Sequence, residues 1–205
     1  MERDSPQTRE KLLDAAESAI LEKGFGATSI DELIAAVGIT KSGFFYHFKG
    51  KSALAEALLR RYLERERILL DQVFGRADKL HEDPLQSLLF ALSLLAELLE
   101  DLPEGNPGCL MAAYCYQDQL FNREVRDLHR EALLAWRRRF ALRIDAIAER
   151  HPPRRPIRAD DLADHLGALI DGGMIVGKAL DDDGLLPRQL LLYRDFLADL
   201  FASRR

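Results

Sequence analysis

Two short helices joined by a tight turn are predicted for residues 28–51, TSIDELIAAVGITKSGFFYHFKGK. Ser29 and Glu32 have the three-residue spacing of a capping box, in which the two residues satisfy each other's free backbone amides at a helix start. Apolar residues then recur at positions 30, 33, 34 and 37, which is one face of a helix. Gly38 ends that helix, and Thr40 caps a second one that runs to about residue 48.

The second helix has an outer face that stability does not explain. At about 100° per residue, Phe44 and Phe48 lie on one side, where they would pack on the preceding helices, while Ser42, Gly43 and Tyr46 face the opposite way. The alternative is that the neighbouring aromatic rings are core and the lysines a solvated face. Three adjacent aromatic residues span too much of the helix circumference for all of them to be buried. The pattern predicts a helix-turn-helix, whose second helix enters the DNA major groove.

A family resemblance is carried by Gly24-Phe25, Thr28-Ser29, Ile34-Ala35, the run from Val37 to Phe48, and Lys51. On these motifs the segment from Thr8 to Lys51 resembles the DNA-binding domain of the TetR family of transcriptional regulators. The resemblance implies a homodimer that binds a palindromic operator in double-stranded DNA and usually represses transcription. It further implies release from DNA when a small-molecule effector enters a C-terminal bundle, with domains at residues 1–51 and 52–205.

The resemblance also assigns DNA-contacting positions. It places Thr28 and Ser29 on a phosphate, as the dipole at a helix start favours, and Lys51 on another phosphate. The recognition-helix positions are Lys41, Ser42, Gly43, Phe45, Tyr46 and His47. The chain departs from the family at Phe45, where tyrosine is most frequent, and at Gly43, where serine or threonine is common.

Composition limits the remaining possibilities. The chain has 205 residues, of which 47% are hydrophobic and 31% charged, as in ordinary globular proteins. No apolar run approaches the roughly 20 residues that cross a bilayer, and the charged N-terminus has no signal-peptide pattern, so we expect a cytoplasmic protein without a membrane partner. The net charge of −5 argues against non-specific coating of nucleic acid.

The rest of the chain predicts an all-α fold of about nine helices, without strand patterns. The first helix begins at Ser5 and ends at Gly24, and a long one runs from Lys51 to about Phe74. Further helices are predicted at Pro84–Leu102, Gly108–Phe121, Arg123–Arg150, Asp160–Leu180 and Pro187–Ala202, with linkers at Pro103–Pro107 and Pro152–Pro156.

The last two helices are apolar around more than half of their circumference. A helix with one side exposed to solvent needs only a single apolar stripe. The pattern therefore indicates two buried faces, one for the core and one for a second subunit. The predicted dimer interface comprises Leu166, Ile170, Met174, Tyr193, Phe196, Leu197 and Leu200. The alternative is that both helices are buried within one monomer.

The middle helices hold the side chains of a predicted effector pocket: Phe90, Met111, Tyr114, Cys115, Gln119, Trp136 and Phe140. Aromatic and sulfur side chains with a few polar groups line such pockets, but they also fill cores. The pocket prediction therefore depends chiefly on the family resemblance.

Enzyme motifs are incomplete, so no enzyme, catalytic residue, cofactor or metal is expected. Gly24-Phe25-Gly26 lacks a preceding strand, and Asp161 with His165 lacks a third metal ligand. Two alternatives stay open: a small-molecule-binding helical protein or enzyme whose N-terminal domain is only structural, and a thiol-based sensor of oxidants or electrophiles. The second would act through Cys109 at a helix start, where the dipole favours thiolate.

Overall fold

The computed structural model describes residues 6–101 and 108–202, and every regular element in them is helical. The all-α prediction is confirmed. The elements are α1 (Pro6–Lys23), α2 (Ile30–Val37), α3 (Lys41–His47), α4 (Lys51–Leu80), α5 (Pro84–Glu100), α6 (Leu110–Cys115), the 3₁₀ helix η1 (Asp118–Leu120), α7 (Arg123–Arg150), α8 (Ala159–Leu180) and α9 (Leu185–Leu200). Within the described residues, no helix combines the length and apolar character needed to span a membrane.

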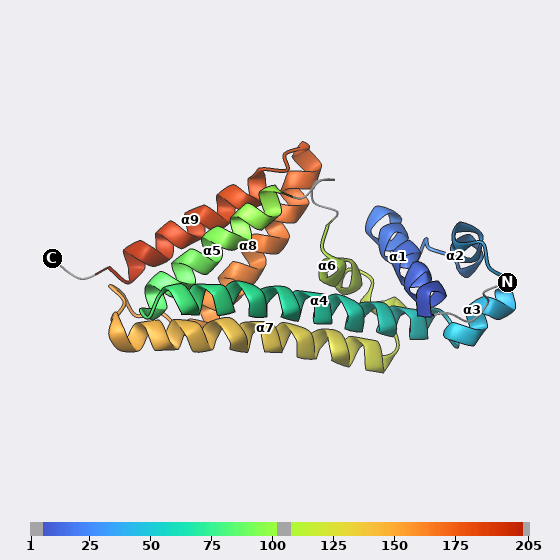
Figure 1. Cartoon of the computed structure of the whole chain (residues 1–205), viewed down its shortest axis with the longest axis horizontal. Coiled ribbons are helices and arrows are strands. Elements are labelled where there is room, and N and C mark those ends of the chain that lie inside the picture. Colours follow the sequence, from blue (N-terminus) through green and yellow to red (C-terminus); the bar gives the residue numbers. More distant parts are fainter. Residues whose placement is uncertain (1–5, 102–107, 203–205) are drawn as a thin grey trace. The chain divides into compact units, whose positions relative to one another are not determined.

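Contacts divide the chain into two packed units, whose elements are labelled in Figure 1. We call Met1–Arg65 with Cys109–Ala132 the N-terminal unit, and Glu66–Gly108 with Leu133–Arg205 the bundle unit. The division differs from the expected boundary between residues 51 and 52. It falls inside α4 and α7, because α6, η1 and the start of α7 pack with the first three helices.

The N-terminal unit has a core of its own. Leu12 and Leu13 of α1, Leu33 of α2 and Phe44 of α3 are at most 1% exposed, and they pack with Leu58 of α4. Side chains from α6 and α7 join this core, among them Leu110, Tyr114 and Val125. The short α2 and α3 are therefore held by burial of their inner faces, since helices of this length are marginal in isolation.

The bundle unit is built on α5, which lies along α9, with α8 packed against α9 (Figure 1). Ala91 and Leu92 of α5, Leu166 of α8 and Leu197 of α9 are at most 1% exposed. Asp83 caps α5 by accepting a hydrogen bond from the backbone amide of Gln86 at 3.0 Å, and Pro84 follows at the first helical position.

Two of the predicted helices differ from those in the structure. Helix α4 continues past Gly75 to Leu80, because Gly75 does not adopt the positive φ that ends a helix at glycine. The helix predicted at Gly108–Phe121 consists of two pieces, α6 and η1. The predicted start at Ser5 and the linker Pro103–Pro107 lie outside the described residues.

Candidate nucleic-acid interface

The start of α2 has the predicted capping box. The Ser29 hydroxyl accepts a hydrogen bond from the Glu32 backbone amide at 3.1 Å, and the Ser29 amide donates to the Glu32 carboxylate at 3.5 Å. Lys23 contacts the same carboxylate and, through that hydrogen bond, lowers the pKa of Glu32. The capping box satisfies the backbone amides of Ser29 and Glu32, so the other backbone amides of the first turn are the ones that could bind a ligand.

The turn between α2 and α3 is closed by Gly38 in the left-handed conformation, with φ of 73°. Its amide donates to the Ile34 and Ala35 carbonyls at 3.0 and 3.3 Å, which ends α2. Thr40 then begins α3, since its hydroxyl accepts from the Gly43 amide at 3.2 Å and shares a 3.0 Å hydrogen bond with the Ser42 hydroxyl. Each of these turn residues has the type that its position requires.

The two faces of α3 are sharply different. Phe44 and Phe48 are 0% and 3% exposed and anchor the helix in the N-terminal unit. On the outer side Tyr46 is 67% exposed and Phe45 46%, and Lys41 and Ser42 are exposed as well. Two large aromatic rings exposed to water contribute little to stability, so this face is a candidate binding surface. The geometry is that of a helix-turn-helix with its second helix ready to enter a major groove.

Comparisons with known proteins agree with this geometry. Residues 12–58 match the family described as bacterial regulatory proteins, tetR family. The transcriptional repressor BepR of Brucella suis is 32% identical over 98 residues, which are 45% of each chain. Residues 12–58 therefore form a DNA-binding domain of the TetR family of transcriptional regulators. The chain spans about half the length of the curated relatives that it matches.

Solved structures of transcriptional regulators share the fold. The regulatory protein TetR from Rhodobacter sphaeroides has a TM-score of 0.74 and 22% identity, covering 94% of this chain and 98% of that one. A transcriptional regulator from Saccharomonospora viridis, solved in complex with choline, has a TM-score of 0.70 and 22% identity, covering 98% and 100%. At this identity the likeness concerns the fold alone.

Two of the residues expected to touch phosphates are already engaged within the N-terminal unit. Thr28 is 2% exposed, and its hydroxyl donates to the Gly24 carbonyl at 2.9 Å, so the hydroxyl is not presented outward as predicted. The Lys51 ammonium donates to the Phe25 carbonyl and lies 4.3 Å from the centroid of the Phe25 ring. Burial lowers the pKa of Lys51. A phosphate would have to share Lys51 with this carbonyl.

Gln117, which no sequence pattern indicated, holds the turn between α1 and α2. Its side-chain carbonyl accepts a hydrogen bond from the Gly26 amide at 2.8 Å. A Cβ on Gly24 would lie 2.4 Å from the Gln117 amide nitrogen, and Gly24 has a φ of 85°, so only glycine fits there. No local pattern marks Gln117, because its partners precede it by more than ninety residues.

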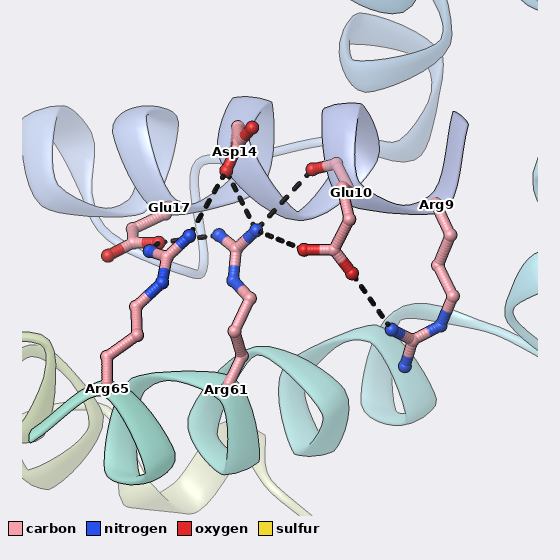
Figure 2. Close-up of polar contacts among 6 residues, drawn as sticks. All are labelled: Arg9, Glu10, Asp14, Glu17, Arg61 and Arg65. Carbon is pink, nitrogen blue, oxygen red and sulfur yellow. Dashed lines mark hydrogen bonds and ion pairs between the residues drawn. The ribbon is translucent and has the colours of Figure 1, made fainter. Parts of the chain in front are cut away.

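An ion-pair network joins α1 to α4 (Figure 2). The Arg61 guanidinium, 11% exposed, contacts the carboxylates of Glu10, Asp14 and Glu17 at 3.1, 2.7 and 2.6 Å. Burial works to lower the pKa of Arg61, but these hydrogen bonds outweigh it and raise the pKa. Arg65 adds a 3.1 Å contact to Glu17. The network fixes α1 on the helix that follows the recognition helix.

The residues predicted for the effector pocket are not brought together in one unit. Tyr114 and Met111 are 1% and 9% exposed within the core of the N-terminal unit, where the Tyr114 hydroxyl donates to the Ala55 carbonyl at 2.7 Å. Cys115 and Gln119 are exposed. The assignment of these four residues to an effector pocket stays a prediction, because filling a core and lining a cavity require the same kinds of side chain.

The other three predicted pocket residues belong to the bundle unit. Trp136 packs on Phe140 with ring centroids 4.4 Å apart, and Phe90 is partly buried against the core beside His81. The Trp136 indole nitrogen is buried and has no hydrogen-bond partner among the described residues. These residues remain candidates for contact with an effector.

The predicted dimer interface also needs correction. Leu166, Tyr193, Leu197 and Leu200 are at most 5% exposed and lie in the core of the bundle unit, where the Tyr193 hydroxyl donates to the Leu162 carbonyl at 2.8 Å. The helical period shows that a helix has two apolar faces but not which of them faces its own subunit. Ile170, Met174 and Phe196 are partly buried against the same core.

A second apolar face does exist on α8 and α9. Val176 and Leu192 are 44% and 60% exposed, and Ala168, Leu169 and Gly172 continue the stripe along α8. These α8 residues line a shallow groove of about 840 Å³, together with Leu185 and Gln189 of α9. The groove is flanked at one end by Asp161, Asp164 and His165.

Cys109 is the N-cap of α6. Its sulfur accepts a hydrogen bond from the Ala112 amide at 3.4 Å, and the residue is partly buried. The thiol-sensor alternative stays a prediction. Among the described residues there is no group of three or more histidine, cysteine, aspartate or glutamate side chains arranged to hold a metal ion.

Proposed function

We propose that this TetR-family regulator acts in the cytoplasm as a homodimeric repressor that binds a palindromic operator and is released by a small molecule. The observation that carries the proposal is the outer face of α3, where Phe45 and Tyr46 are 46% and 67% exposed beside an anchored Phe44. Aromatic rings and small polar groups at these positions contact thymine methyl groups, sugars and phosphates in a major groove.

The homodimer is supported by the exposed stripe on α8 and α9. A monomeric protein rarely leaves a continuous apolar patch in water, and a second copy of the same stripe would cover Val176 and Leu192. Two-fold symmetry would also present two recognition helices to half-sites about 34–36 Å apart. As dimer contacts we therefore propose Leu169, Gly172, Val176 and Leu192, in place of the four predicted interface residues that lie in the core.

The effector response is supported by polar groups inside the bundle unit. The Trp136 indole nitrogen is a buried donor without a partner among the described residues. Burial raises the pKa of Glu66, although Arg139 opposes the rise, and Asp171 adds to it. Groups of this kind orient a bound small molecule. The regulator from S. viridis was solved with choline, and BepR is described as a repressor.

Selection of binding sites from random duplex DNA tests the proposal. The purified, effector-free protein should enrich a palindrome at near-physiological salt, and its affinity should fall steeply as salt rises. The enriched palindrome then locates target genes, whose products narrow the chemistry of the effector. If a folded protein enriches nothing across several salt concentrations, the alternative of a binding protein with a structural N-terminal domain takes its place.

A further inference from the structure

A groove of about 560 Å³ lies in the N-terminal unit just beyond the C-terminal end of α3. It is lined by His47, Phe48 and Lys49, and by Arg9 near the start of α1. Helix α4 contributes Ala53, Glu56, Ala57, Arg60 and Arg61 to the lining. The DNA-contacting positions that the family resemblance assigns do not include Arg9, Lys49 or Arg60.

The groove carries more positive charge than its own carboxylate offsets. Glu56 is the acid in its lining, and Arg60 pairs with it at 3.0 Å. The Arg61 charge is satisfied by three carboxylates of α1. Arg9 approaches Glu10 at 3.4 Å, with both side chains about half exposed, so that pair is weak. The Lys49 ammonium has no ionic partner in the part of the chain that the structure describes.

The side chains of Arg9 and His47 add to the polar lining of the groove. The Arg9 guanidinium is held 5.3 Å from the centroid of the Phe48 ring, which fixes its direction at the groove wall. The His47 Nε2 atom is buried and lacks a hydrogen-bond partner among the described residues. A buried nitrogen without a partner costs free energy unless a ligand or water supplies one.

The position of the groove relative to α3 identifies the anion. The seven residues of α3 span about 10 Å at 1.5 Å per residue, and the major groove of DNA is about 12 Å wide. When the N-terminal half of such a helix contacts base edges, its C-terminal end must approach the bounding sugar–phosphate strand. Lys41, beside Asp31 of α2, marks the N-terminal end of α3, and the groove begins at the other end.

We propose that Arg9 and Lys49, assisted by Arg60 and His47, bind a backbone phosphate of the operator that lies outside the base contacts of α3. The inference rests on the proposed DNA binding and adds a phosphate contact on the flank opposite to α2. Such a contact positions α3 in register without reading sequence. Affinity for every duplex depends on it, whereas preference between duplexes does not.

The test compares Arg9→Ala and Lys49→Ala with two control variants, Arg76→Ala and Lys79→Ala, which remove the same charges from the bundle-unit part of α4. The probes are the enriched palindrome and a scrambled duplex of equal length. Each substitution occurs twice in a dimer, so the slope of log affinity against log salt should become less steep by about 1.8. At about 0.15 M salt this corresponds to an affinity loss of about 30-fold, with an unchanged ratio between the two duplexes.

A second experiment, with chemically modified DNA, identifies the phosphate that is contacted. Neutral methylphosphonate groups are placed one at a time along the flank of the palindrome, and one position should weaken the wild-type protein but not Lys49→Ala. Arg9→Lys, which keeps the charge, should retain the wild-type salt slope, and circular dichroism should show that all variants are folded.

The outcomes separate the two proposals. If the wild-type protein binds the palindrome and Lys49→Ala has the same salt slope and methylphosphonate profile, the flanking contact is wrong and the repressor proposal stands. If the wild-type protein binds neither duplex, both proposals fail. A loss of preference for the palindrome in Lys49→Ala would also overturn the inference, since it would show a contact to bases.

Discussion

Replacing Tyr46 by alanine should weaken DNA binding while leaving the protein folded. A fully buried aromatic side chain covers about 200 Å², so a ring that is 67% exposed removes only about 65 Å² from water. At about 25 cal/mol per Å² its loss costs at most about 1.6 kcal/mol of unfolding free energy. Phe44, which is 0% exposed, should cost about 3–5 kcal/mol on the same replacement.

Tyr46→Ala should affect DNA binding more strongly than it affects stability. A good contact to a base edge contributes about 1–3 kcal/mol, and a dimer makes it twice, so Tyr46→Ala should lower operator affinity at least about 30-fold. Urea unfolding followed by circular dichroism gives the stability of both variants. Fluorescence anisotropy with the enriched palindrome gives the affinity of Tyr46→Ala.

Two results would refute the reasoning. If Tyr46→Ala unfolds as readily as Phe44→Ala, the ring belongs to the core and α3 has no free outer face. If Tyr46→Ala is stable and binds the palindrome as tightly as the wild-type protein, the exposed face of α3 is not the DNA-contacting surface.

Three other predictions concern packing, titration and assembly. Gly24→Ala should lower the unfolding free energy by at least about 1 kcal/mol, because the φ of 85° and the Gln117 amide 2.4 Å from the new Cβ both oppose a side chain. Adding Gln117→Ala should restore only the part of this loss that comes from the steric clash, as measured by urea unfolding. Burial raises the pKa of Tyr114, so the tyrosine ionises first in the unfolded chain, and stability should fall as the pH rises through about 10. In thermal melts, Tyr114→Phe should reduce this dependence of stability on pH. The same dependence in Tyr114→Phe and in the wild-type protein would contradict the burial. Val176→Asp with Leu192→Glu should shift the protein from dimer to monomer in sedimentation velocity without loss of helicity, whereas an unaltered dimer would place the interface elsewhere.

The helix-turn-helix was predictable because its signals are local. A capping box at Ser29, a left-handed Gly38 and a capping Thr40 each involve partners within four residues along the chain. Their geometry depends little on distant packing, so the residue types alone indicate it. The inward direction of Phe44 and Phe48 follows from the helical period, and both are at most 3% exposed.

Tertiary contacts between distant segments were not predictable in this way. Gln117 holds Gly26 across more than ninety residues, and Tyr114 reaches the Ala55 carbonyl across more than fifty. A polar residue at the end of a short helix has no periodic signature, so nothing near Gln117 indicates its partner. For the same reason the sequence did not place Met111 and Tyr114 of α6 in the core of the N-terminal unit.

The contrast between α3 and α9 shows what a sequence pattern can decide about a surface. On α3 the aromatic residues exceed what one buried face can hold, so at least one ring had to be exposed, and Tyr46 is. On α9 the apolar residues fill two faces that differ only in what covers them. Leu192 and Leu197 are chemically identical, yet one is 60% exposed and the other 0%. Only the packing of α5 and α8 against α9 distinguishes them, and that packing identifies Leu192, not Leu197, as the residue to mutate in a test of dimerisation.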